Sequence, residues 1–391
     1  CNGLPFAPSF SLYSEATDTT YFEQPAKATG NDRFDNAPNK DDWYETIKLN
    51  YGVDYCNPCN ERTEHFDPIP STWKKMTDIL LFWARKGVDG FRCDMAEMVP
   101  SAFWTYAIKE VKNEFPYILF IGEVYNPSLY DTYLQSGFDY LYDKVGMYDC
   151  VRGVIAGTRK PTEITKQWQA TDHIKNKMLY FLENHDEQRI ASPFFANDAE
   201  KGFPGVVVSS LLLPNPFMLY AGQELGEPGM DAEGFSGRDG RTTIFDYWGI
   251  DKLYRGYYKK NALTAQEKVI WDKYNAILRI ASKEKVVSVG SFFDLMYANP
   301  LTSNFNSNSL YAFIRAYKQE VLLVVANFSD LEMQCAINIP RHAFEHLSLS
   351  EGQVNAVDLL TGETTFQMFS PEKPFKVGID PYGARVYKFT L

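Results

Sequence analysis

A short stretch of the sequence places an arginine and an aspartate at the end of an apolar run. Arg92 and Asp94 lie two positions apart, directly after a run that contains Val88 and Phe91. If this run is a strand, both side chains point to the same face. A guanidinium beside a carboxylate favours an acid that is held in its ionised form. Taken alone, such a pair is more often a structural ion pair at a strand end.

Two later stretches repeat the arrangement. The apolar run that starts at Tyr117 ends in Glu123, and the run that starts at Lys177 ends in His185 and Asp186. Helical patterns separate the three runs. Strands that each deliver an acid at the carboxyl end, with helices between them, are the way in which a parallel α/β barrel builds an active site.

The motifs themselves point to a family. The sequences GFRCD (90–94), IGEVY (121–125) and ENHDEQR (183–189) resemble, in order and spacing, three signature regions of glycoside hydrolase family 13, the α-amylase family. The resemblance implies an α/β fold, a (β/α)8 TIM barrel, of which this chain holds the five C-terminal strand–helix units. It also implies a C-terminal antiparallel β-sandwich domain.

The resemblance implies a role for each polar residue of the motifs. Asp94 would be the nucleophile and Glu123 the general acid/base that protonates the leaving oxygen. Asp186 would be the third acid, which holds sugar hydroxyls and favours the distorted ring. Arg92 would keep Asp94 ionised, and His185 would bind hydroxyls of the sugar at the cleaved bond. A core histidine with satisfied hydrogen bonds is the alternative for His185.

Residues near the motifs bear on the substrate. Tyr125 is predicted to bind substrate by stacking, and Trp104 and Phe103 are candidates for which a place in the core is as plausible. Many α-amylases that cleave within a chain carry a Lys-His pair three and four residues after the nucleophile, where this sequence has Glu97 and Met98. The linkage cleaved and the preferred chain length therefore stay open.

The proposed domains follow from this pattern. Residues 1–66 are polar and loop-like and resemble domain B of the family, residues 67–285 form the partial barrel (strands 4 to 8), and residues 286–391 form the β-sandwich. The family's first signature region has no match, so residue 1 is expected to follow the third barrel strand. A further 100–150 N-terminal residues, as about three strand–helix units would need, or another chain would complete the barrel, and the 391 residues alone should show little hydrolysis.

Two helices are predicted in detail because their patterns are strong. The helix over 71–86 should be capped by Ser71 or Thr72 and should bury a stripe of apolar side chains. The members of this stripe are Met76, Ile79, Leu80 and Trp83. The helix over 264–282 should have one apolar face, formed by Val269, Ile270, Tyr274, Ile277 and Leu278.

Composition excludes several classes of partner. The net charge of −11 and the lack of a basic run argue against nucleic acid and anionic membranes, and no apolar stretch is long enough to span a membrane. The six cysteines are too few for a disulfide scaffold, although Cys56 and Cys59 allow a local disulfide or half a zinc site. No metal site or other cofactor is predicted; calcium is expected only if the upstream region is present. Cys1 is either a lipid-bearing residue or an arbitrary start, and a secreted, periplasmic or surface-attached location is favoured over the cytoplasm.

The leading functional hypothesis is a retaining hydrolase of α-linked glucans, such as starch and maltodextrins, that forms a covalent glycosyl-aspartate intermediate. A transglycosylase or isomerase of the same family shares the chemistry up to that intermediate. A non-catalytic barrel that binds carbohydrate or a partner protein would be free to lose its acids, yet Asp94, Glu123 and Asp186 are all present. An unrelated α/β hydrolase lacks its Gly-x-Ser-x-Gly elbow here.

Overall fold

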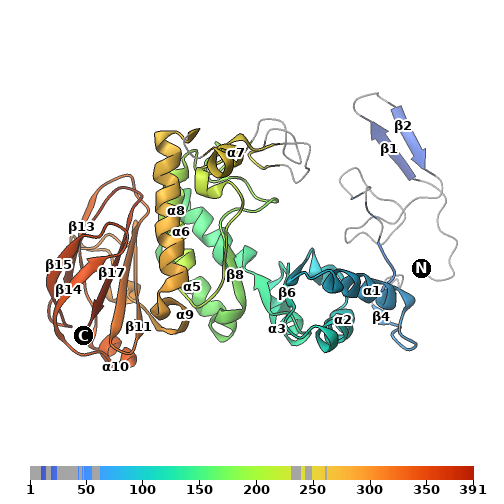
Figure 1. Ribbon diagram of the computed structural model, residues 1–391, viewed down its shortest axis with the longest axis horizontal. Helices are drawn as coiled ribbons and strands as arrows, with labels where there is room; N and C mark the ends of the chain where they lie inside the picture. Colours follow the sequence, from blue (N-terminus) through green and yellow to red (C-terminus); the bar gives the residue numbers. More distant parts are fainter. Residues whose placement is uncertain are drawn as a thin grey trace. The chain divides into compact units, whose positions relative to one another are not determined.

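The structure is a computed structural model of the chain, and it describes residues 10–14, 19–23, 43, 46, 48–54, 62–229, 239–242, 249–259 and 262–391. The chain divides into two compact units, residues 1–142 and 143–391 (Figure 1). No helix within these described ranges has the length and apolar character needed to cross a membrane.

The first unit begins with two small antiparallel pairs of strands. The pairs are β1 (Phe10–Ser14) with β2 (Thr19–Glu23), and β3 (Val53–Asp54) with β4 (Thr63–Glu64). Most of the region predicted to resemble domain B, including Cys56 and Cys59, lies outside the described residues. That prediction therefore stays a prediction.

The first unit then forms three parallel strands connected by helices. The strands are β5 (Gly90–Cys93), β6 (Leu119–Gly122) and β7 (Tyr140–Tyr142), and the helices are α1 (Ser71–Arg85), α2 (Ser101–Glu114) and α3 (Tyr130–Gln135). Cys93 is opposite Gly122, and Gly122 is opposite Leu141. Because the three strands end in register, the residues that follow β5 and β6 lie at the same edge of the sheet.

Helix α1 forms where the pattern predicts it, but with a different cap and a different buried face. Its N-cap residue is Pro70, with no side-chain cap. Ile79 and Trp83 of the predicted stripe are about half exposed, whereas Trp73 is buried. The Trp73 ring contacts Phe103 (5.9 Å between ring centroids), and its Nε1 donates to the backbone oxygen of Tyr51 (2.9 Å). These long-range partners, which the local pattern does not contain, decide the rotation of the helix.

The second unit begins with the remaining parallel strands. Strands β8 (Met178–Phe181) and β9 (Phe217–Met218) pair in parallel. They are accompanied by the π-helix η3 (Lys144–Tyr148), α4 (Asp149–Ile155), α5 (Thr162–Ala170), α6 (Phe203–Leu211), α7 (Asp251–Tyr258) and α8 (Ala265–Lys283). All five strands that the sequence predicted for the barrel are thus present, three in the first unit and two in the second.

Helix α8 forms where the sequence predicts it. Thr264 Oγ1 accepts from the backbone N–H of Glu267 (3.2 Å), and the Glu267 carboxylate accepts from the N–H of Thr264 (2.8 Å), which completes a capping box. Ile270, Tyr274 and Ile277 of the predicted face are buried, Leu278 is half-buried, and Val269 is exposed.

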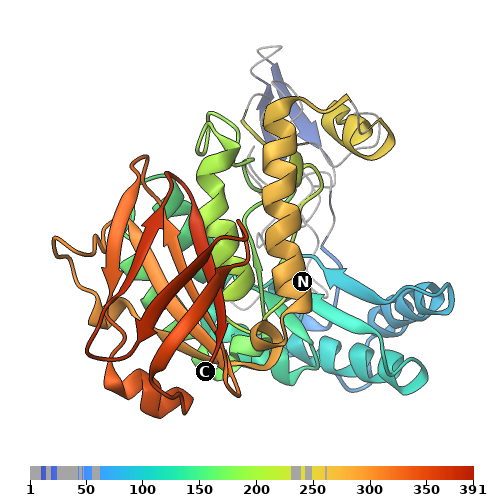
Figure 2. The same ribbon diagram turned by 60° about the vertical axis from the view of Figure 1, so that its left-hand side comes forward.

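The C-terminal part of the second unit is the predicted antiparallel β-sandwich (Figure 1; Figure 2 shows it in orange and red beside the long helix α8). One sheet has the strand order β10-β11-β12-β17-β14-β15, and the other pairs β13 with β16. The strands are β10 (Ser291–Asp294), β11 (Leu310–Tyr317), β12 (Glu320–Asn327), β13 (Met333–Ile337), β14 (Gly352–Asp358), β15 (Thr364–Phe369), β16 (Phe375–Ile379) and β17 (Ala384–Thr390), with α9 (Lys285–Val289) before them and α10 (Arg341–Leu347) among them. The predicted domain boundaries at 66/67 and 285/286 stay predictions.

A buried arginine ties this sheet to the helices of the same unit. Arg315 on β11 donates from Nη1 to the backbone oxygen of Leu211 (3.0 Å), at the end of α6. Its Nη2 donates to the oxygens of Val287 (2.6 Å) and Gly290 (2.8 Å), at the end of α9. Burial lowers the pKa of Arg315 to about 10. The carbonyl ends of two helices therefore solvate this cation in place of a carboxylate.

Candidate active site

Arg92 joins two carboxylates at the carboxyl ends of adjacent strands. Its Nη1 lies 3.0 Å from Oδ2 of Asp94, and its Nη2 lies 2.9 Å from Oε2 of Glu123. The Asp94 side chain is 73% exposed, whereas that of Glu123 is 2% exposed. The Tyr142 ring, at the end of β7, lies 5.6 Å from the guanidinium carbon. The Arg92 cation therefore fixes the exposed Asp94 and the buried Glu123 relative to each other.

The backbone after β5 turns so that it also binds Glu123. Met95 has a left-handed conformation (φ 40°). Its N–H donates to Glu123 Oε2 at 2.9 Å. The parallel ladder continues through Glu123, whose N–H donates to the oxygen of Cys93 (3.0 Å) and whose own oxygen accepts from Ala96 (2.9 Å). Glu123 is thus fixed at both its backbone and its side chain.

The surroundings of Glu123 give it the protonation behaviour of a general acid. Burial raises its pKa, the Met95 N–H and the charge of Arg92 lower it, and the nearby Asp94 raises it again through hydrogen bonding and charge. The net effect is a pKa above the ordinary value for glutamate. An acid of this kind keeps its proton closer to neutral pH, as proton transfer to a leaving group requires.

Tyr125 completes this group of side chains. Its hydroxyl lies 3.1 Å from Oε1 of Glu123, to which it can donate. The sequence predicted Tyr125 as a residue that stacks on sugar; the structure adds this contact with the acid. Trp104 and Phe103, the other aromatic candidates, are buried in the core.

The second unit holds the third predicted acid together with its histidine. His185 Nε2 lies 3.1 Å from Oδ2 of Asp186, and both side chains are partly exposed. The N–H of Asp186 donates to Oδ1 of Asn184 (2.9 Å), a local turn that fixes the backbone directly after β8. His185 and Asp186 therefore lie within hydrogen-bond distance of each other, a contact that the sequence did not predict.

A buried ion pair that the sequence did not suggest supports this loop. Glu183 Oε2 accepts from Nη1 of Arg189 (2.8 Å), and Glu183 Oε1 accepts from the N–H of Ile190 (2.7 Å). Burial raises the pKa of Glu183, while Arg189 lowers it. These two residues lie at the ends of the third motif and close the loop that presents His185 and Asp186.

The π-helix η3 anchors the same loop from outside. Glu187, the residue after Asp186, accepts from the Tyr148 hydroxyl (2.9 Å) and lies 3.1 Å from Lys144 Nζ. Lys144 in turn pairs with Asp149 (2.8 Å). Single-turn π-helices occur often at functional sites. The sequence gave no signal for this anchor, because its partners are about 40 residues away.

The predicted site residues thus form two groups, each within one unit. Arg92, Asp94, Glu123 and Tyr125 come together in the first unit, and His185 and Asp186 in the second. The meeting of Asp186 with the first group stays a prediction. Over the part of the chain that the structure describes, no group of three or more His, Cys, Asp or Glu side chains is suited to hold a metal ion.

Comparison with known proteins points to one family. The family model for the alpha amylase catalytic domain matches residues 68–279, more than half of the chain. Neopullulanase 2 of Thermoactinomyces vulgaris is 22% identical over 325 residues, which are 82% of this chain and 48% of that protein. Alpha-amylase 3 of Dictyoglomus thermophilum is 25% identical over 282 residues, 67% of this chain and 54% of that protein. The chain thus spans about half the length of these relatives.

Solved structures support the fold. An Anoxybacillus α-amylase matches with a TM-score of 0.62 at 18% identity, covering 85% of this chain and 65% of that chain. The α-amylase of Geobacillus thermoleovorans, solved with acarbose, matches with a TM-score of 0.62 at 18% identity, covering 85% of this chain and 67% of that chain. The fold predicted from the sequence is therefore confirmed.

Proposed function

Because the chain belongs to the alpha-amylase catalytic-domain family, we propose that the protein is a retaining glycoside hydrolase of α-linked glucans such as starch and maltodextrins. One observation carries the proposal. The Arg92 guanidinium bridges the exposed carboxylate of Asp94 and the buried carboxyl group of Glu123, whose pKa is raised. A retaining glycosidase needs such a pair, one ionised and one protonated.

In the first chemical step, Glu123 transfers its proton to the glycosidic oxygen while a carboxylate oxygen of Asp94 attacks the anomeric carbon. The bond between that carbon and the leaving oxygen breaks, and a glycosyl ester with Asp94 forms. Arg92 binds Asp94 on Oδ2, which leaves Oδ1 as the attacking oxygen. The same cation holds the Asp94 carboxylate in position for the attack.

In the second step, water replaces the leaving sugar. Glu123, now ionised, takes a proton from water, and the water oxygen attacks the anomeric carbon, which releases Asp94. Arg92 and the N–H of Met95 stabilise the Glu123 carboxylate while it carries charge. Because the two donors lower the pKa of Glu123, they favour the departure of its proton in the first step, and they hold the carboxylate in place as the base of the second step.

His185 and Asp186 are proposed to hold hydroxyl groups of the sugar at the cleaved bond. Both side chains end the β8 motif, lie within hydrogen-bond distance of each other and are partly exposed. The anchored Glu187 restrains the backbone beside them. Charged hydrogen bonds to hydroxyls that strengthen as the ring distorts would lower the barrier.

The proposed substrate class agrees with the names of similar proteins. The matched relatives include a neopullulanase and α-amylases, and the α-amylase of Geobacillus thermoleovorans was solved with acarbose. Glu97 and Met98 still separate this chain from α-amylases with a Lys-His pair at this place. The linkage and the length of the glucan are therefore left to product analysis.

The test compares one acid variant on two substrates. Glu123→Gln should lower the hydrolysis of maltoheptaose by about 10²- to 10⁴-fold, because the leaving sugar then lacks its proton. It should release fluoride from α-maltosyl fluoride at a much smaller loss, because fluoride leaves without protonation. Asp94→Asn should lower both rates by on the order of 10⁴-fold or more.

The control variant is Asp380→Asn, which changes an exposed aspartate of the β-sandwich that also pairs with an arginine. It should keep wild-type rates on both substrates. Equal losses in Glu123→Gln on both substrates would contradict the role of Glu123 as the acid. Products longer than the starting glucan would instead identify a transglycosylase.

A further inference from the structure

The two oxygens of the Glu123 carboxyl group have different surroundings. Oε2 lies 2.9 Å from Nη2 of Arg92, a charge contact, and accepts from the N–H of Met95 (2.9 Å). Both groups keep their hydrogens at any pH at which the protein folds. A proton on Oε2 would therefore face a positive charge and the hydrogen of an N–H group, which can only donate. The proton of Glu123 is therefore more favourable on Oε1.

The group that faces Oε1 is the hydroxyl of Tyr125, 3.1 Å away. A phenol hydroxyl can donate or accept. It can accept from Oε1–H while Glu123 is protonated, and it can donate to Oε1 once Glu123 is ionised. No main-chain N–H has this freedom, because it only donates. The Tyr125 hydroxyl can therefore form a hydrogen bond with Glu123 both when the carboxyl group is protonated and when it is ionised.

We propose that the proton transferred by Glu123 resides on Oε1, and that the Tyr125 hydroxyl holds it there and stabilises the carboxylate after the proton has left. The inference rests on the proposed role of Glu123 as general acid/base, and it gives Tyr125 a role beyond stacking on sugar. The oxygen that delivers the proton to the leaving group is then Oε1, beside the Tyr125 ring.

The charged groups that surround Glu123 within its unit do not replace Tyr125. Arg92 is bound to Oε2, and its charge lowers the pKa of Glu123, whereas Asp94 raises it. Tyr142 acts on Arg92 rather than on Glu123. All three groups remain in place when only the hydroxyl of Tyr125 is removed. A change in the titration of Glu123 in such a variant therefore reports on the hydroxyl.

Glu97 positions Tyr125 through the next peptide group. Its Oε2 accepts from the N–H of Asn126 at 3.0 Å, which ties the loop after β6 to the loop after β5. The Tyr133 hydroxyl donates to the backbone oxygens of Glu97 (3.1 Å) and Val99 (2.9 Å) and fixes the loop that carries Glu97. Glu97 thus acts as a positioning residue at the place where the sequence departs from many α-amylases.

The test is a direct titration of Glu123 in the intact protein without substrate. Glutamate labelled with ¹³C at the carboxyl carbon gives the signal, and the Glu123→Gln spectrum assigns it by difference. Tyr125→Phe should raise the pKa of Glu123 by about one unit. The variant loses the hydrogen bond to Glu123 in both protonation states, and the bond to the ionised form is the stronger one. The alkaline limb of the pH profile of kcat/KM should move upward by the same amount.

Three variants separate positioning from general damage. Tyr297→Phe removes a tyrosine hydroxyl that contacts His342 and not Glu123, and it should leave the titration midpoint unchanged. Glu97→Ala should move the midpoint in the same direction as Tyr125→Phe, and Glu97→Gln, which keeps an oxygen acceptor for Asn126, should restore it.

An unchanged or lowered midpoint in Tyr125→Phe would overturn the proposal, as would an equal shift in Tyr297→Phe. These results are distinct from a failure of the proposed function, because the titration needs no turnover. A protein that hydrolyses no glucan but shows the shift would refute the hydrolase and keep the proton on Oε1. A protein that hydrolyses maltoheptaose and shows no shift would keep the hydrolase and refute the proton on Oε1.

Discussion

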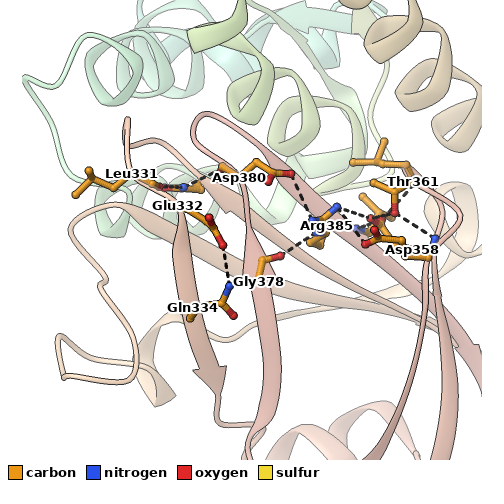
Figure 3. A network of polar contacts seen from close by, with 12 residues as sticks. Leu331, Glu332, Gln334, Asp358, Thr361, Gly378, Asp380 and Arg385 are labelled. Carbon is orange, nitrogen blue, oxygen red and sulfur yellow. Dashed lines mark hydrogen bonds and ion pairs between the residues drawn. The ribbon is translucent and has the colours of Figure 1, made fainter.

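Two arginines of this protein have nearly the same surroundings and different uses. Arg92 contacts the buried Glu123 and the exposed Asp94. Arg385, on β17 of the sandwich, contacts the fully buried Asp358 (3.2 Å) and the exposed Asp380 (3.4 Å), as Figure 3 shows. In both places a single guanidinium joins one acid inside the protein to one at its surface.

The difference lies in the donors around the buried acid. Asp358 Oδ1 accepts from the N–H groups of Leu360 (3.2 Å) and Val386 (3.0 Å). Its Oδ2 accepts from the Thr361 hydroxyl (2.8 Å) and from Arg385 (3.2 Å). All four lone pairs are thus filled. Four donors therefore hold the Asp358 carboxylate in place.

Glu123 has fewer donors. Its Oε2 accepts from the N–H of Met95, and its Oε1 faces the hydroxyl of Tyr125, which can both donate and accept. The comparison teaches that an arginine between two carboxylates is not by itself a catalytic site. What distinguishes the first pair is an oxygen of the buried acid that can gain and lose a proton.

The largest expected effect on stability breaks the structural pair. Asp358→Ala leaves Nη1 of Arg385, the Thr361 hydroxyl and two backbone N–H groups without their acceptor, and it should lower the free energy of unfolding by about 3–5 kcal/mol. Glu123→Gln keeps the shape of the side chain and an oxygen acceptor, and it should change that free energy by less than about 1 kcal/mol. Urea unfolding of the two variants measures both values. Equal destabilisation would show that the two carboxylates contribute equally to the stability of the fold, which would contradict this comparison.

A third buried acid gives a smaller effect that sharpens the rule. Asp143 Oδ1 accepts from the N–H of Met147 (2.8 Å), whereas its Oδ2 has no hydrogen-bond partner among the residues the structure describes. Burial raises the pKa of Asp143 from 3.8 to about 6. Burial thus makes Asp143 bind its proton more tightly, as it does in Glu123.

The consequence for stability has a defined sign. The pKa of Asp143 is higher in the folded protein than in the unfolded chain. The contribution of Asp143 to the free energy of unfolding is therefore fully present below about pH 4 and is lost as the pH rises through about 6. The loss corresponds to about 3 kcal/mol. Asp143→Asn should remove this part of the pH dependence between pH 4 and 7, as measured by urea unfolding at each pH. Parallel curves for the variant and the wild type would contradict the raised pKa.

The parts of the fold and site that were predictable depend on local patterns. Apolar runs that end in an acid located Asp94, Glu123 and Asp186, and the acids of the first two runs meet because Cys93 pairs with Gly122. The helix predicted over 264–282, which starts at Thr264, likewise agrees with α8 within one residue at each end.

The parts that were missed depend on residues that are distant in the sequence. The buried face of α1 is set by the contacts of Trp73 with Tyr51 and Phe103, not by the apolar stripe. The N–H of Met95 that binds Glu123 belongs to the backbone and leaves no trace in residue types. The Arg385 network joins β17 to Asp358, which is 27 residues away, so spacing gives no warning of it.

The central claim is that Asp94 forms a covalent bond with the sugar while Glu123 serves as acid and base. The most direct measurement is to incubate the intact protein with 5-fluoro-α-D-glucosyl fluoride, which slows release of the intermediate, and to map the mass increase by peptide sequencing. The account predicts one added fluoroglucosyl group per chain, on Asp94, and none in Asp94→Asn. Labelling of another carboxylate, or turnover of the reagent with no ester on Asp94, would contradict it.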